Sequence, residues 1–64
     1  MGLSSREKEV LTYAAQGRTY KEIANGLYIS YETVATHIKN ICEKTDSRNV
    51  REAIYKLMIA KDGK

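Results

Sequence analysis

Three side chains near the middle of the chain have the types and spacing needed to hydrogen-bond to the edges of nucleic-acid bases. They are Thr36, Lys39 and Asn40, which a helix would bring onto adjoining parts of one surface. Lysine donates to guanine O6 and N7, asparagine pairs with adenine, and threonine offers a hydroxyl or a methyl group. Ala35 is small and would let the backbone come close to a base pair. We therefore treat these four residues as candidates for base reading.

The helix that must position these side chains is expected over residues 31–45, with Ser30 as its N-cap. At about 100° per residue, three apolar residues and one threonine fall within about 40° of one direction. This core stripe consists of Val34, Ile38, Ile41 and Thr45. The base-reading candidates lie on the opposite side or on the flanks. A purely solvated face has the same polarity, so the pattern alone gives the two interpretations similar weight.

Capping signals predict three further helices. In "SSRE", "TYKE" and "NVRE", a Ser, Thr or Asn stands three residues before a Glu, so that each side chain can bond to the other residue's amide. The expected helices span residues 5–16, 20–26 and 50–60. We expect Gly17 to end the first helix and Gly26 to help the chain leave the second, because glycine readily adopts left-handed conformations.

The composition agrees with one compact all-α domain. Sixty-four residues suffice for a single domain only. Hydrophobic residues make up 42% and charged residues 30%, which is typical of globular chains, and proline is absent. We therefore expect a four-helix domain over residues 1–64. Residues 20–45 should form a helix-turn-helix within it, because its two helices are joined only by a short turn around "YIS".

The charge and the cysteine content narrow the classes of partner. The formal net charge of +3 and the pI of about 9.1 favour an acidic partner such as nucleic acid or an anionic membrane surface. No apolar run approaches the roughly 20 residues of a membrane span, so no membrane-spanning segment is expected. Of the two acidic partners we predict nucleic acid, and no membrane partner. A single cysteine excludes an internal disulfide and favours a cytoplasmic protein.

Catalysis and metal binding are not expected. The chain has one histidine, His37, and one cysteine, Cys42, which cannot supply three or four nitrogen and sulfur ligands. No nucleophile, base and orienting group fall at a recognisable spacing. We therefore predict no enzyme activity, no catalytic residue, no metal and no cofactor. His37 is expected at the boundary of the core stripe, within reach of a DNA phosphate.

The start of the second helix has features that suit phosphate binding. The N-terminus of a helix carries a partial positive charge, and in a helix-turn-helix this helix crosses the DNA backbone. Lys21 and the amides near Thr19 and Tyr20 are placed for that contact. Tyr31, at the start of the third helix, can either reach a phosphate through its hydroxyl or pack against the second helix, and the sequence leaves both roles open.

Two apolar residues of the fourth helix lie outside its expected core stripe. That stripe consists of Val50, Ile54, Leu57 and Met58. Tyr55 and Ile59 lie off it, about one turn apart. Apolar residues on an outer face suggest a partner surface, although single exposed apolar groups are common. We take these two residues as candidates for a homodimer interface.

The stretch from Leu3 to about Ile54 resembles the LuxR/GerE-type DNA-binding domain of bacterial transcription regulators. The resemblance rests on "LSSREKEVL", "QG", "KEIA" and "ISYETVATHIKNI". It implies a four-helix domain whose third helix enters the major groove of double-stranded DNA and reads bases at Ala35, Thr36 and Lys39. It also implies phosphate contacts at Lys21 and Thr33 and a dimer contact through the fourth helix. RNA polymerase is a further candidate partner.

The chain departs from the family pattern at three places, and one of them, Ser5 in place of a common proline, is tolerated at the first position of a helix. Ala35 stands where many members carry lysine or arginine, which removes one base contact. Thr45, Asp46 and Ser47 replace a typical Leu-Gly-Val in the loop after the third helix. We predict sequence-specific binding of double-stranded DNA by a transcriptional regulator. The alternative is a helical protein-interaction module that uses its fourth helix and has incidental DNA affinity.

Overall fold

The computed structural model describes residues 2–59, and every regular element in that range is helical. The elements are α1 (Ser5–Ala15), α2 (Tyr20–Leu27), α3 (Tyr31–Lys44), α4 (Val50–Ile54) and the π-helical turn η1 (Tyr55–Ile59) that continues α4. The predicted all-α class and the four helices are confirmed. The ends of the first three helices differ from the prediction by one residue each. Residue 60, the predicted end of the fourth, lies outside the described range.

Local hydrogen bonds explain where the first three helices begin. Ser4 and Glu7 form a complete capping box: the Glu7 amide donates to Ser4 Oγ at 3.1 Å, and the Ser4 amide donates to Glu7 Oε1 at 2.9 Å. Thr19 and Glu22 repeat this arrangement at the start of α2. At α3, Ser30 Oγ accepts from the amide of the third helical residue at 3.1 Å. Each start therefore follows from residues only three positions apart.

The exit from α2 differs from the prediction. Gly26 lies inside the helix, and a Cβ atom built on it would meet Tyr13 Cε2 at 3.8 Å. The left-handed residue is Tyr28, with φ of 60°. This conformation lets the Ile29 amide donate to the Ala24 carbonyl at 3.0 Å, which closes the helix end. The expectation that Gly26 releases the chain is therefore wrong, whereas Gly17 has the expected positive φ, at 87°.

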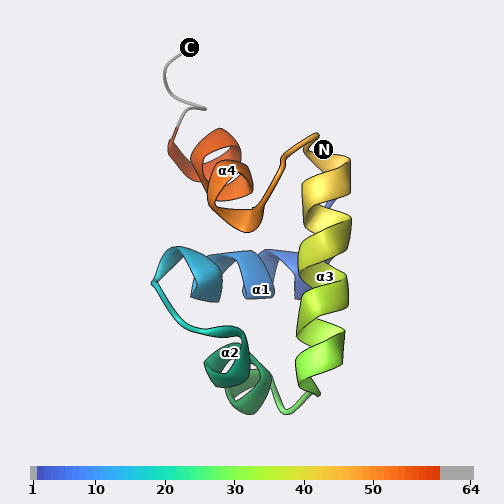
Figure 1. The fold of residues 1–64 in the computed structure, drawn as a ribbon, viewed down its shortest axis with the longest axis vertical. Coiled ribbons are helices and arrows are strands. Elements are labelled where there is room, and N and C mark those ends of the chain that lie inside the picture. Colours follow the sequence, from blue (N-terminus) through green and yellow to red (C-terminus); the bar gives the residue numbers. More distant parts are fainter. Residues whose placement is uncertain (1, 60–64) are drawn as a thin grey trace.

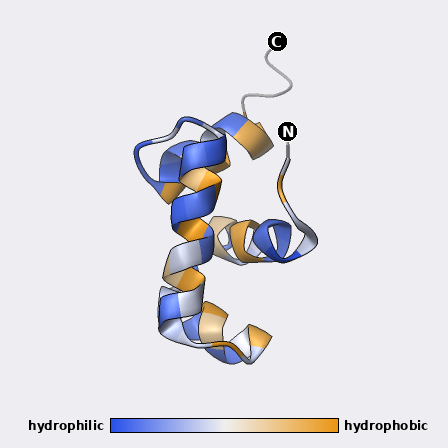
Figure 2. Cartoon of the chain, turned by 90° about the vertical axis from the view of Figure 1, so that its right-hand side faces the viewer, coloured by the Kyte–Doolittle hydropathy of each residue, from blue (hydrophilic) through white to orange (hydrophobic). Residues whose placement is uncertain are grey.

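The helices pack around a small core in which α3 contacts the other three (Figure 1). The helix α1 lies between α2 and α4, and all three pack against α3. The buried apolar residues are Val10, Leu11, Ile23, Ala24, Val34, Ile38, Ile41 and Ala53. Figure 2 shows polar and apolar residues alternating along α3, as expected for a helix with one buried side. The predicted core stripe of α3, including Thr45, is buried.

The core-facing side of the fourth helix agrees with the prediction at three of its four residues and adds Ala53. Its fully buried residue is Ala53, whereas Val50, Ile54 and Leu57 are partly buried against the core. Met58 is 39% exposed, so its assignment to the core was wrong. The helix packs against both α1 and α3, and the small side chain of Ala53 allows a close approach at that junction.

A partly buried ion pair joins the start of α1 to the end of α3. Lys44 Nζ donates to Glu7 Oε1 at 2.8 Å and to the Gly2 carbonyl at 3.0 Å. Glu7 is 4% exposed. A buried carboxylate is costly without a partner. Lys44 therefore compensates the negative charge of Glu7, which is buried where it accepts the capping bond from the Ser4 amide.

The loop between α3 and α4 is closely bonded despite its departure from the family pattern. The buried Thr45 hydroxyl donates to the Ile41 carbonyl at 2.8 Å and lies 2.6 Å from Ser47 Oγ. Lys56 Nζ donates to the carbonyls of Thr45, at 3.1 Å, and of Asp46, at 2.6 Å. Hydroxyls and a lysine from η1 therefore fix this loop. Over the described range, no helix combines the length and apolar character needed to cross a membrane.

Candidate nucleic-acid interface

The outer side of α3 carries the residues proposed to read bases. Thr36 and Lys39 are exposed, whereas Val34 and Ile38, on the opposite side of the helix, are 0% and 5% exposed. This difference arises because the other three helices all pack against the apolar side of α3. The flanking candidates Ala35 and Asn40 are of intermediate exposure. The exposed surface thus combines a flexible cation with small or hydrogen-bonding groups.

The turn that leads into α3 is accessible and rich in hydroxyl groups. Thr33 is exposed, and its Oγ1 lies 2.9 Å from Ser30 Oγ, so the two hydroxyls form one hydrogen-bonded pair. Tyr28, at the turn, is 94% exposed. A hydroxyl pair at a helix start can donate to a phosphate oxygen if one proton is turned outward.

The capping box at the start of α2 occupies one of the amides expected to face phosphate. The Thr19 amide donates to Glu22 Oε1 at 2.9 Å. The amides of Tyr20 and Lys21 donate to no acceptor within residues 2–59, and the side chain of Lys21 is exposed. Phosphate binding at this helix end would therefore use these two amides and the lysine, while the Glu22 carboxylate opposes it.

The two tyrosines at the junction of α2 and α3 contact each other. The ring centroids of Tyr20 and Tyr31 are 5.7 Å apart, at an interplanar angle of 47°. Packing against the second helix, one of the two roles considered for Tyr31, is therefore present, and 55% of this residue remains exposed. Burial raises the pKa of the Tyr20 hydroxyl, which keeps it protonated and able to donate.

A shallow groove of about 420 Å³ runs beside α3 and brings several candidates together. This α3 groove is lined by Tyr20, Ala35, Ile38, Lys39, Cys42, Glu43, Ser47, Arg48, Asn49 and Val50. Two base-reading candidates thus share a surface with one phosphate candidate from α2. Arg48 and Asn49, from the loop after α3, were not predicted as site residues. A basic residue in the loop that follows α3 was the available signal for Arg48.

His37 and Cys42 are both partly buried. Burial raises the pKa of the Cys42 thiol, which makes it a poorer nucleophile. Among residues 2–59, no three His, Cys, Asp or Glu side chains gather in a way that could hold a metal ion.

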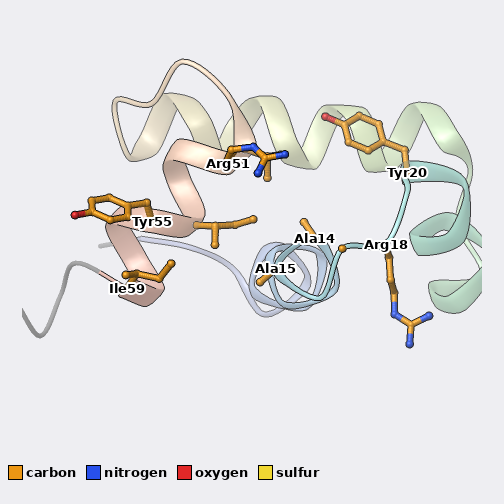
Figure 3. A pocket seen from close by; sticks show the side chains of 10 residues that line it. Ala14, Ala15, Arg18, Tyr20, Arg51, Tyr55 and Ile59 are labelled. Atoms are coloured by element: carbon orange, nitrogen blue, oxygen red, sulfur yellow. The ribbon is translucent and has the colours of Figure 1, made fainter.

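The outer surface of α4 and η1 exposes apolar side chains. Tyr55 is 57% exposed and Ile59 is 60% exposed. Both lie at the edge of a groove between α1 and α4, shown in Figure 3, in which Arg51 points toward Tyr20. Met58 adds a third partly exposed apolar group to this end of the molecule. The surface offers contact area to a protein partner.

A helix-turn-helix with an exposed polar face on its second helix is the arrangement by which one class of DNA-binding domains places that helix in the major groove. The chain belongs to the family described as bacterial regulatory proteins of the luxR family, whose model matches residues 1–57. Members of this family are DNA-binding transcriptional regulators and not enzymes.

Individual relatives support this assignment. The chain is 39% identical over 56 residues to the spore germination protein GerE of Bacillus subtilis, covering 88% of this chain and 76% of that protein. It is 53% identical over 51 residues to the transcriptional activator protein EsaR of Pantoea stewartii subsp. stewartii, covering 80% of this chain but 20% of EsaR. It is 46% identical over 54 residues to the transcriptional regulatory protein LiaR of Bacillus subtilis, covering 83% and 26% respectively. The chain spans about a fifth to a quarter of the first curated relatives that it matches.

Proposed function

We propose that this chain reads a specific sequence in double-stranded DNA by placing α3 in the major groove. The observation that carries the proposal is the two-sided character of α3, which buries Val34 and Ile38 and exposes Thr36 and Lys39. The major groove of B-DNA is about 12 Å wide and admits one helix. In this arrangement Lys39 donates to guanine, and Thr36 and Asn40 contact neighbouring base edges.

Contacts to the DNA backbone would set the position of α3 without reading sequence. The proposed phosphate contacts come from the start of α2 and the turn into α3, at Thr19, Tyr20, Lys21, Tyr31, Thr33 and His37. The free amides of Tyr20 and Lys21 support this role most directly, because helix N-termini bind anions. Glu22 already occupies the Thr19 amide, so we expect Thr19 to contribute least.

We further propose that two copies bind together through α4 and η1. One small module buries too little surface for tight binding, and two half-sites about one helical turn apart would raise the affinity. The exposed apolar side chains of Tyr55 and Ile59 supply a candidate contact. The operator should then contain two related half-sites.

Selection from random duplex DNA at fixed salt tests the proposal, followed by titration of the selected site with three variants. We expect Lys39→Ala to lose about 1–3 kcal/mol on the selected site and to relax sequence preference at one position. Lys21→Ala should weaken binding to all sequences and reduce the salt slope by about 1. Lys8→Ala is the matched control, because it removes the same charge from the exposed side of α1. Equal losses on selected and random DNA for Lys39→Ala would refute base reading by α3.

The exposed apolar groups on η1 also favour a second candidate, a protein-interaction module. Here the partner would bind α4 and η1, and DNA affinity would be incidental. Neutralising Lys21 and Lys39 together separates the two functions. Partner binding that survives this change, combined with no enriched DNA sequence in the selection, would favour the protein-interaction module.

A further inference from the structure

The loop after α3 places an arginine on the same groove as the proposed base-reading residues. Arg48 lines the α3 groove together with Lys39 and Ala35 of α3 and Tyr20 of α2. The groove therefore has a recognition helix on one side and a loop cation on the other. A duplex that accepts α3 in its major groove has a phosphate backbone on each side of that helix. Because Tyr20 of α2 and Arg48 line the same groove, the backbone that runs past α2 on this side of α3 would also pass the loop that carries Arg48.

This loop is held in place by bonds on both sides of Arg48. Before Arg48, the Ser47 amide donates to the Cys42 carbonyl at 2.8 Å, and Lys56 Nζ donates to the carbonyls of Thr45 and Asp46. The Arg48 amide itself donates to Glu52 Oε1 at 2.7 Å. A loop fixed in this way presents its side chain with little ordering cost when a ligand binds.

The guanidinium of Arg48 is available for an external anion. The residue is exposed, and its side chain forms no hydrogen bond or ion pair with any residue between 2 and 59. Two carboxylates lie nearby: Glu43, on the same groove, and Glu52, which accepts from the Arg48 amide. The negative end of α3 adds to them. Without Arg48, this end of the groove would repel DNA, so the arginine compensates a local negative charge.

We infer that Arg48 binds a phosphate of the DNA backbone that flanks this side of α3, which makes the loop after α3 a further backbone contact. The inference rests on the proposed function, because it requires α3 to lie in the major groove. The fixed loop positions the arginine, and its planar group donates two hydrogen bonds to one phosphate. It contributes affinity and register but no sequence preference.

Fluorescence anisotropy with a selected duplex and a random duplex, over a range of salt concentrations, tests the inference. One phosphate contact contributes about 0.9 to the slope of log K against log salt, which is about an eightfold change between roughly 0.1 M and 1 M salt. We expect Arg48→Ala to lower the slope by about 0.9 and to weaken both duplexes about eightfold near 0.1 M salt. Arg48→Lys should keep most of the slope because it keeps the charge. Lys8→Ala serves as the control for loss of one positive charge.

The possible results separate the inference from the proposed function. Suppose that the salt slope of Arg48→Ala equals that of Lys8→Ala, while Lys39→Ala still loses affinity for the selected site. The phosphate contact of Arg48 is then refuted, and the proposal that α3 reads DNA sequence stands. If the unaltered chain retains no DNA, both are refuted. Circular dichroism checks that each variant is folded. If Arg48→Ala unfolds, Arg48→Lys is used to test the phosphate contact. A salt slope that falls by about 0.9 even with lysine at this position would contradict a contact made through charge.

Discussion

The ion pair between Glu7 and Lys44 should make a measurable contribution to stability, and two substitutions can separate its parts. Glu7→Gln removes the charge but keeps an oxygen that can accept from the Ser4 amide, since glutamine also serves in capping boxes. Lys44→Met removes the cation and leaves the Glu7 carboxylate, which is 4% exposed, without its ion-pair partner. The two variants therefore differ in whether an uncompensated charge remains.

The magnitudes follow from the burial of the two groups. A hydrogen bond to a charged group contributes about 1.5–3 kcal/mol and a neutral one about 0.5–1.5 kcal/mol. The side chain of Lys44 is 41% exposed, which places the contribution at the lower end. We expect Glu7→Gln to cost about 1 kcal/mol and Lys44→Met about 2 kcal/mol. In a domain of this size, these losses lower Tm by about 4–8 °C and 8–16 °C.

The pH dependence supplies an independent check. The hydrogen bond from Lys44, followed by that from the Ser4 amide, lowers the pKa of Glu7 below its ordinary value of 4.5. A carboxyl with a lowered pKa in the folded state stabilises the fold fully above its unfolded pKa. This stability is lost as the pH falls through the folded pKa. The advantage of the unaltered chain over Glu7→Gln should therefore be constant near pH 7, begin to decline near pH 4.5, and disappear once the pH is below the lowered pKa of the folded state.

Urea unfolding followed by circular dichroism between about pH 3 and pH 7 measures the stability losses and their pH dependence. The double variant, Glu7→Gln with Lys44→Met, completes a double-mutant cycle that gives the coupling between the two residues. Lys8→Met is the control, because that lysine is exposed and forms no ion pair with another described residue. If Glu7→Gln and Lys44→Met both unfold within about 0.3 kcal/mol of the unaltered chain, or if their effects add without coupling, the ion pair does not stabilise the fold.

Two other substitutions give further tests. Tyr28→Gly should stabilise the fold by about 0.5–1 kcal/mol in urea unfolding, because glycine relieves the left-handed backbone of an exposed residue; a loss of stability would mean that the tyrosine ring contributes more than the strain costs. Glu43→Gln should tighten DNA binding about twofold at low salt, because one like charge about 8 Å from a phosphate in water is worth about 0.5 kcal/mol. An equal gain from Glu9→Gln on α1 would show a general charge effect.

The sequence by itself was sufficient for the helix starts and for which side of α3 is buried. Each helix start depends on a residue pair three positions apart, and the N-cap side chain accepts the expected amide bond at all four starts. The predicted return bond of the capping box forms at Glu7 and Glu22, whereas Glu52 accepts from the Arg48 amide in place of the Asn49 amide. The buried stripe of α3 follows from the 100° helical repeat, which needs no knowledge of the neighbouring helices. Thr36 and Lys39 lie on the side of α3 opposite this buried stripe, and the same repeat therefore predicts that they are exposed.

The tertiary structure decided which residues meet across large sequence separations. Glu7 and Lys44 are 37 residues apart, and no local pattern marks them as partners. The burial of Ala53 in place of Met58 depends on α4 packing into the junction of α1 and α3. Arg48 reaches the α3 groove because Lys56, ten residues from Asp46, fixes the loop. Local hydrogen bonds are encoded by adjacent residues, whereas these contacts depend on the relative placement of whole helices, which only packing determines.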